Sequence, residues 1–161
     1  MSPLQKRLGL FLALGFALLP LIATPAQNGK GKPAEKNQSF KGNVVALDKL
    51  LAKDAIKPDA DAVPAWRVLE TEDGKIIPLV KDDGSRMFFK DDRLLNRPMK
   101  LTGRLVAGGT LLQVVDAQSY VKGKRCEIYY WCDICSIRAH ELGVCACCLG
   151  PTELREVPIK Q

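Results

Sequence analysis

The sequence predicts an all-β protein: a small five-stranded Greek-key barrel with one short helical connection, followed by a cysteine-rich tail. Two observations support this fold class. Between Phe40 and Lys122, five short runs of β-forming residues alternate with turns that contain glycine, proline or aspartate. All six cysteines lie beyond these runs, between Cys126 and Cys148. We therefore expect the barrel over residues 40–122 and the tail over residues 123–161.

The chain begins with a pattern that is typical of a secretory signal. Lys6 and Arg7 precede a charge-free apolar run of fifteen residues from Leu8 to Ile22, and Thr24-Pro25-Ala26 fits a cleavage site. The alternative is an uncleaved membrane anchor, but the run is shorter than the roughly 20 apolar residues that span a bilayer. Residues 1–26 are therefore predicted to be a signal peptide, and the mature chain to be exported to a periplasmic or extracellular location.

The formal charge of +6 is concentrated near the N-terminus. Residues 27–39 are basic and poor in apolar side chains, which predicts a disordered arm. Residues 42–121 contain equal numbers of acidic and basic side chains. The folded part is therefore close to neutral, and we do not expect nucleic acid as a partner. Membrane contact is expected only through the N-terminal segment, if it is not cleaved.

The first three predicted strands lie before residue 81. Phe40 to Leu47 is rich in β-forming residues and contains Gly42, where a strand can bend. A loop rich in aspartate and proline follows over residues 53–64. Residues 66–72 and 75–80 then flank Asp73-Gly74, which predicts a hairpin with a two-residue turn.

The last two strands follow a short helical piece. Residues 87–96 have the apolar spacing of a short helix or turn, and residues 99–107 and 110–121 form two β-rich runs joined at Gly108-Gly109. With the first strand (KGNVVAL) and the hairpin (WRVLETEDGKIIPLV), this order resembles the OB-fold. The resemblance covers half the chain and implies a binding module.

The cysteines are spaced as two pairs, Cys132-x-x-Cys135 and Cys145-x-x-Cys148, with nine residues between them. Two such turns can direct four thiolates at one zinc ion, with Zn–S distances of about 2.3 Å. Cys147 is an alternative fourth ligand, and Cys126 lies outside the set of four ligands. A Cys126–Cys147 disulfide beside the zinc site would use all six thiols. In an oxidising compartment, three disulfides or one redox-active pair are the alternatives.

The tail resembles a short zinc ribbon, in which two thiolate turns hold two small hairpins together. A segment of fewer than about 40 residues generally needs a metal or disulfides to fold, and the cysteine cluster is the candidate for either. Ribbons commonly place glycine directly after the second cysteine of each turn. Here Ser136 and Leu149 occupy those positions.

Other chemical motifs are weak. His140 lies between the cysteine pairs but is expected to be an exposed loop residue, because four better-spaced thiols are available. Asp82-Asp83 and Asp91-Asp92 lack the alternating spacing of a calcium loop. A single histidine and no nucleophile motif predict a protein that is not an enzyme.

The expected function is that of an exported, non-catalytic binding or scaffolding module of the cell envelope with a structural zinc site. Its partner would be an envelope protein or a small ligand that the sequence does not identify. The alternative is a metal- or thiol-handling protein that uses reactive cysteines of the tail.

Overall fold

The computed structural model of the protein describes residues 36–59 and 66–160. The predicted signal peptide, most of the predicted arm and residues 60–65 of the loop lie outside the described residues. The described residues belong to one compact unit. In the described part of the chain, no helix is long and apolar enough to cross a membrane.

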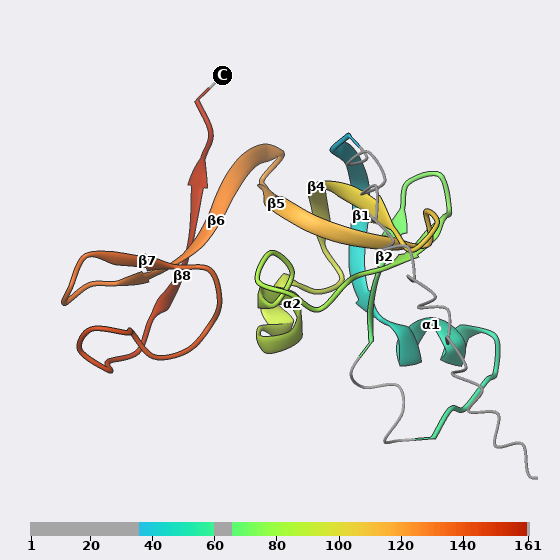
Figure 1. Ribbon diagram of the computed structural model, residues 1–161, viewed down its shortest axis with the longest axis horizontal. Coiled ribbons are helices and arrows are strands. Elements are labelled where there is room, and N and C mark those ends of the chain that lie inside the picture. Colours follow the sequence, from blue (N-terminus) through green and yellow to red (C-terminus); the bar gives the residue numbers. More distant parts are fainter. Residues whose placement is uncertain (1–35, 60–65, 161) are drawn as a thin grey trace, which may run out of the picture. The chain divides into compact units, whose positions relative to one another are not determined.

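The prediction of an all-β protein is confirmed. The described residues form eight strands, two short α-helices and one 3-10 turn (Figure 1). In chain order these are β1 (Gln38–Ala46), α1 (Leu47–Lys53), β2 (Arg67–Thr71), β3 (Ile76–Pro78), α2 (Met87–Lys90), η1 (Asp92–Leu94), β4 (Pro98–Val106), β5 (Leu111–Val121), β6 (Lys124–Cys132), β7 (Ile137–Ala139) and β8 (Glu153–Pro158).

The strands form one open sheet in the order β3-β2-β1-β4-β5-β6-β7, with β8 paired to β6. All of these pairings are antiparallel. An isolated parallel bridge joins Leu79, just after β3, to Leu112 in β5, and the Val80 N–H donates to the Leu112 carbonyl oxygen at 2.9 Å. The sheet is open, so the closed five-stranded barrel expected from the sequence is not shown.

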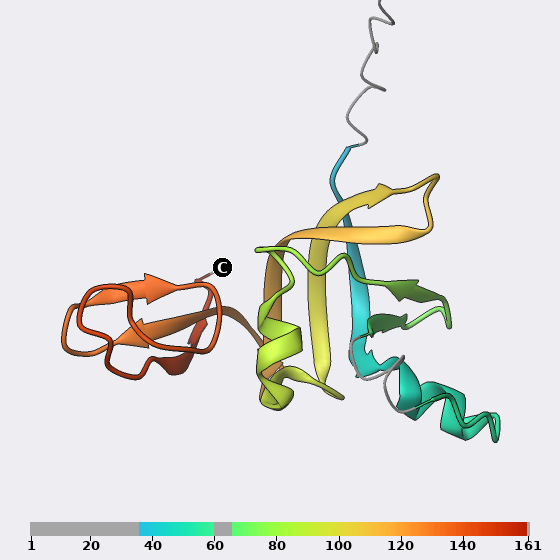
Figure 2. The same cartoon turned by 60° about the horizontal axis from the view of Figure 1, so that its bottom comes forward.

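One helix was not expected from the sequence. Helix α1 directly continues the chain from β1 (Figure 2), where the sequence predicts the end of a strand and then a loop. Its composition, LDKLLAK, favours a helix, and none of its side chains is fully buried. The helix therefore forms at the surface from local preference.

The turn between β2 and β3 is one residue longer than predicted. Residues 72–74 connect Thr71 to Lys75, with the Thr71 N–H donating to the Lys75 carbonyl oxygen at 2.9 Å. The Thr71 hydroxyl oxygen accepts the Lys75 N–H at 2.8 Å and donates to Asp73 at 2.5 Å. The prediction of a two-residue turn was therefore wrong, because the hydrogen bonds of the Thr71 side chain stabilise a longer loop. Gly74 still has a positive φ of 81°.

Gly42 allows β1 to pair with strands on both of its edges. Residues 42–46 pair with β2, and residues 38–43 pair with β4. A Cβ atom at Gly42 would lie 2.1 Å from the Glu70 carbonyl oxygen. Only glycine therefore fits at this crossing.

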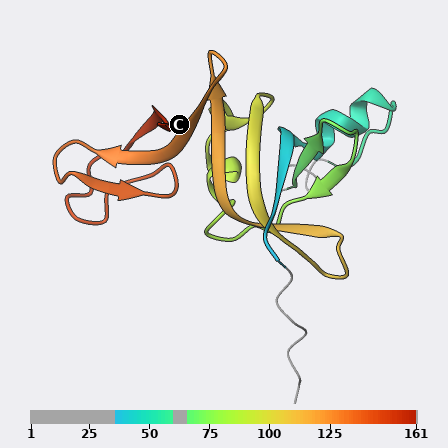
Figure 3. The ribbon, with the colours of Figure 1, turned by 90° about the horizontal axis from the view of Figure 1, so that it is seen from above.

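The core is shared by the predicted barrel and the predicted tail. Its buried side chains include Val44, Leu69, Phe88, Leu94, Met99, Leu101, Leu112, Val114, Ile128 and Tyr130. The last two belong to β6, beyond the boundary predicted after Lys122. That boundary coincides with the turn between β5 and β6 (Figure 3). The tail therefore contributes part of the core against which the first five strands pack.

A buried polar contact links α2 and η1 to β6. The Tyr130 hydroxyl donates to the Asp91 carboxylate at 2.8 Å, and the Arg93 guanidinium donates to the same carboxylate at 2.8 and 2.7 Å. Burial tends to raise the pKa of Asp91, but the hydrogen bonds from Arg93 and Tyr130 outweigh it and lower the pKa. Burial and Asp91 together raise the pKa of Tyr130, so its hydroxyl remains a proton donor at neutral pH.

A second polar contact joins β8 to the other strands. Arg97 donates two hydrogen bonds to the Glu156 carboxylate, at 2.6 and 3.2 Å, and the buried hydroxyl of Ser119 donates to it at 2.5 Å. Residues from three separate parts of the chain therefore meet at one carboxylate.

Replacing Gly74 by valine should lower the free energy of unfolding by more than about 1 kcal/mol. No atom lies within 4 Å of a Cβ at this position, so the cost comes from the positive φ alone. Gly74→Asn is the matched control, because asparagine tolerates this region, and it should cost less. Urea unfolding of both variants gives the measurement, and equal losses would contradict the backbone explanation.

Tyr130→Phe should cost about 1–3 kcal/mol of stability, because it removes a donor from a buried carboxylate. Tyr129→Phe is the control: this neighbouring side chain is half-buried on the other face of β6, and its change should cost less than about 0.5 kcal/mol. Equal losses in the two variants, measured by urea unfolding, would contradict the role of the Tyr130 hydroxyl.

The same contact predicts how stability depends on pH. The lowered pKa of Asp91 means that its contribution is fully present above the ordinary aspartate pKa of about 3.9 and is lost as the pH falls through the folded-state value. The stability difference between the wild type and Asp91→Asn, measured by urea unfolding, should therefore shrink as the pH falls below about 4.

Candidate metal centre

The first cysteine turn begins where β6 ends. Cys132 is the last residue of β6 and is buried, so its position follows from the sheet. The Ser136 N–H donates to the Cys132 carbonyl oxygen at 2.8 Å, which closes the turn around Cys135. The chain then returns as β7, whose residues 137–139 pair with residues 130–132 of β6. The hairpin fixes both thiols on one short loop.

The second cysteine turn is closed in the same way. The Leu149 N–H donates to the Cys145 carbonyl oxygen at 3.0 Å, and the Cys145 N–H donates to the Gly150 carbonyl oxygen at 2.8 Å. A bridge between Val144 and Pro151 holds the two ends of the loop together. Cys148 therefore lies on the same turn as the buried Cys145.

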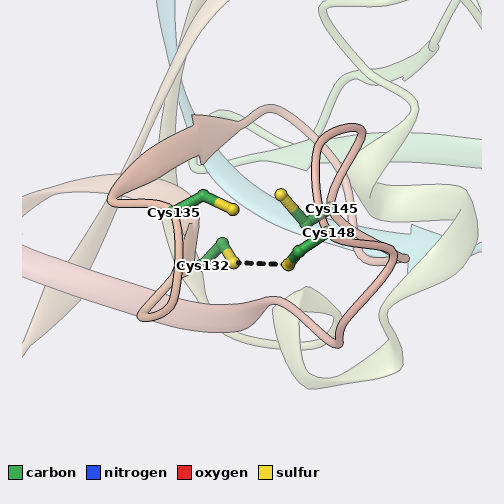
Figure 4. A group of neighbouring side chains, drawn as sticks. All are labelled: Cys132, Cys135, Cys145 and Cys148. Atoms are coloured by element: carbon green, nitrogen blue, oxygen red, sulfur yellow. Dashed lines mark hydrogen bonds between the residues drawn. The ribbon is translucent and has the colours of Figure 1, made fainter.

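The two turns bring four thiols together, as Figure 4 shows. The sulfur atoms of Cys132, Cys135, Cys145 and Cys148 all lie within 4.8 Å of one another, and those of Cys132 and Cys148 are 3.5 Å apart. In a tetrahedral site with metal–sulfur distances of about 2.3 Å, the sulfurs are about 3.8 Å apart. These four thiols can therefore hold a metal ion with little rearrangement.

The backbone of the second turn favours a thiolate. The N–H groups of Cys148 and Cys147 point at the Cys145 sulfur and lower its pKa to about 7, and the Cys147 N–H lies 3.4 Å from that sulfur. In contrast, hydrogen bonding with the thiols of Cys147 and Cys148 raises the pKa of Cys135. A cation bound between the sulfurs would replace the shared protons, because metal binding requires thiolates.

The other two cysteines are in different places. Cys147 is exposed and lies on the second turn, beside the four-thiol cluster. Cys126 is buried near the start of β6, where it pairs with Ser119 and Pro158. It precedes Cys132 by six residues, about 20 Å along an extended strand. All six thiols are free, and the structure does not bring Cys126 and Cys147 together.

His140 and the acidic pairs do not join the thiol cluster. His140 is exposed and is not one of the four clustered ligands. Asp91 is instead the buried partner of Tyr130 and Arg93. The sequence carries no local signal for the contact between Asp91 and Tyr130, because the two residues lie far apart along the chain.

Comparison of the chain with protein-family models, with curated proteins and with solved structures gave no match.

Both turns place a residue with a side chain where ribbons commonly have glycine. Ser136 has a φ of 54° and Leu149 a φ of 60°, so each is in the left-handed region that L-residues occupy at a cost. Leu149 is 72% exposed, and little buried contact offsets that cost. Both positions therefore have a backbone conformation that glycine adopts without this cost.

Replacing Ser136 or Leu149 by glycine should stabilise the metal-loaded protein by up to about 1 kcal/mol, because glycine removes the left-handed penalty. Ser136→Ala and Leu149→Ala are the controls, since alanine retains the penalty. The measurement is the urea midpoint of each metal-loaded variant. Glycine variants that are less stable than their alanine counterparts would contradict the prediction.

Proposed function

We propose that this chain is an exported, non-catalytic binding or scaffolding module of the cell envelope, stabilised by a structural zinc ion. The proposal of a zinc ion depends on one observation: two hydrogen-bonded turns bring four thiol sulfurs within 4.8 Å of one another. A tetrahedral set of four sulfur ligands favours zinc over harder cations such as magnesium or calcium. We assign the ligands to Cys132, Cys135, Cys145 and Cys148.

A structural role fits this ligand set better than a catalytic one. Catalytic zinc sites have three protein ligands and leave one position for water or substrate, whereas four thiolates close the coordination sphere. The second turn lies in the segment between β7 and β8. Cys145 is the one buried apolar side chain of this segment. A zinc ion would hold this segment to the end of β6.

The binding role is proposed from the arrangement of the first five strands. Their order, β3-β2-β1-β4-β5, and the parallel bridge between Leu79 and Leu112 support an OB-type barrel, because the bridge joins the two ends of that order. OB-folds serve as binding modules. Export is proposed from the apolar run and cleavage site within residues 1–26.

A second candidate function is metal or thiol handling, and the exposure of Cys147 favours it. This thiol lies beside the cluster and hydrogen-bonds with Cys135, so it is placed to exchange with a ligand. Thiol counting under native conditions separates the two functions. Slow reaction of all four cluster thiols with a thiol reagent supports the structural role. Fast reaction of these thiols, as expected if Cys147 exchanges with a ligand, supports the handling role.

Zinc analysis of protein isolated without chelators should find one zinc per chain. Cys132→Ser and Cys135→Ser should each abolish stoichiometric binding, whereas the control Cys126→Ser should retain the metal. Structural zinc contributes roughly 10–16 kcal/mol of apparent binding free energy near neutral pH, so its loss should unfold the less supported second turn. No metal together with three intact disulfides would overturn the proposal.

The same preparation tests two further expectations. Zinc should be released as the pH falls, because protons compete for the thiolates. Mass spectrometry of the exported protein should find an N-terminus near Gln27. Retention of residues 1–26 in a membrane fraction would support an anchor in place of a signal peptide.

A further inference from the structure

A hollow of about 780 Å³ lies between the β5–β6 turn and the chain that follows β8. Its lining comprises Tyr120, Gly123, Lys124, Arg125, Pro158, Ile159 and Lys160. Every charged side chain in this lining is cationic, and Lys122 adds a further cation in the adjoining turn. We refer to this surface as the basic groove.

The arginine of the basic groove differs from the other arginines in the described part of the chain. Within residues 36–59 and 66–160, seven of eight arginines contact an acidic or polar partner through their side chains: Arg67, Arg86, Arg93, Arg97, Arg104, Arg138 and Arg155. Arg125 has no such partner in that part of the chain, and neither have Lys122, Lys124 and Lys160. The groove therefore retains uncompensated positive charge.

Nearby carboxylates do not neutralise the groove, because other arginines occupy them. Glu127, two residues after Arg125, lies 2.6 Å from Arg138. Glu156, two residues before the groove residue Pro158, lies 2.6 Å from Arg97. Both acids are thus held in ion pairs outside the groove lining.

The groove combines cations with apolar surface. Tyr120 is the cross-strand partner of Arg125, and the Ile159 N–H donates to the Arg125 carbonyl oxygen at 2.9 Å. Tyr120 and Ile159 therefore flank Arg125 on neighbouring segments, with Lys124 and Lys160 beside them. The exposed Val157 adds apolar surface on β8. Cations beside aromatic and aliphatic side chains suit a membrane interface, where headgroup phosphates lie next to acyl chains.

We propose that the basic groove binds the phosphate groups of an anionic phospholipid surface. The cations attract the headgroup phosphates. Tyr120 and Ile159 contact the apolar boundary that lies beneath the phosphates. The choice of lipid over nucleic acid rests on the proposed export of the chain, since an exported protein faces membrane surfaces. The groove itself does not depend on that proposal.

The test is sedimentation of the full chain with phosphatidylcholine vesicles, prepared with and without phosphatidylglycerol. The double variant K124E/R125E should bind phosphatidylglycerol vesicles at least twentyfold more weakly than the wild type, because each cation contributes roughly fivefold. The control K41E/K57E makes the same change in net charge at two exposed lysines outside the groove, and it should bind within threefold of the wild type. Raising the salt concentration should weaken wild-type binding.

A second measurement locates the contact and does not depend on the N-terminal apolar run. Short-chain phosphatidylglycerol should shift the amide resonances of residues 123–125 and 159–160 in the full chain, whereas inorganic phosphate at the same concentration should shift them less. Equal binding by the wild type and K124E/R125E, together with unshifted groove amides, would overturn the proposal. So would a single-stranded oligonucleotide that shifts these amides at lower concentration than the lipid.

The failure of this proposal and that of the proposed function are distinguishable. Vesicle binding and amide shifts are measured on purified protein, whereas export is read from the N-terminus and the cell fraction. An unchanged urea unfolding midpoint in K124E/R125E excludes loss of the fold as the cause of weaker binding.

Discussion

The alternation of side chains along β6 is the constraint on which much of the structure depends. Cys126, Ile128, Tyr130 and Cys132 lie at every second position and are all buried, so one face of a single strand carries the end of the core and the first thiol of the cluster. A shift of one residue would turn all four outward. The register of β6 against its neighbours therefore determines both the core and the thiol cluster.

Two polar contacts secure β6 and β8 against the rest of the sheet. Tyr130 donates a hydrogen bond to the buried Asp91. Glu156 of β8 accepts hydrogen bonds from Arg97 and Ser119. Leaving any one of these groups buried without its partner would cost more than the hydrogen bond itself contributes. The contacts thus specify how the cysteine-rich segment joins the first five strands, while apolar burial supplies most of the free energy.

The thiol cluster has one rigid side and one less supported side. Cys132 belongs to a nine-residue strand that is paired on both edges, by β7 and β8 near its end. Cys145 and Cys148 belong to a loop held mainly by backbone hydrogen bonds and by one isolated bridge. A bound metal would therefore organise the second turn against the first. This asymmetry also explains why an exposed thiol such as Cys147 can lie so close to the cluster.

The sequence by itself determined the β-class, the positions of the first five strands to within a few residues and the identity of the four clustered cysteines. These features depend on local signals: alternating apolar residues, glycine at bends and turns, and the C-x-x-C spacing. It did not determine the length of the Thr71–Lys75 turn, where a threonine side chain changed the loop, or the helix that follows β1.

Only the tertiary structure decided that β6 is shared between the core and the thiol cluster, that Asp91 meets Tyr130, and that the cations near Arg125 gather without acidic partners in the described chain. Each of these three features depends on residues that are distant in sequence. The pairing of strands in the folded sheet brings these residues together.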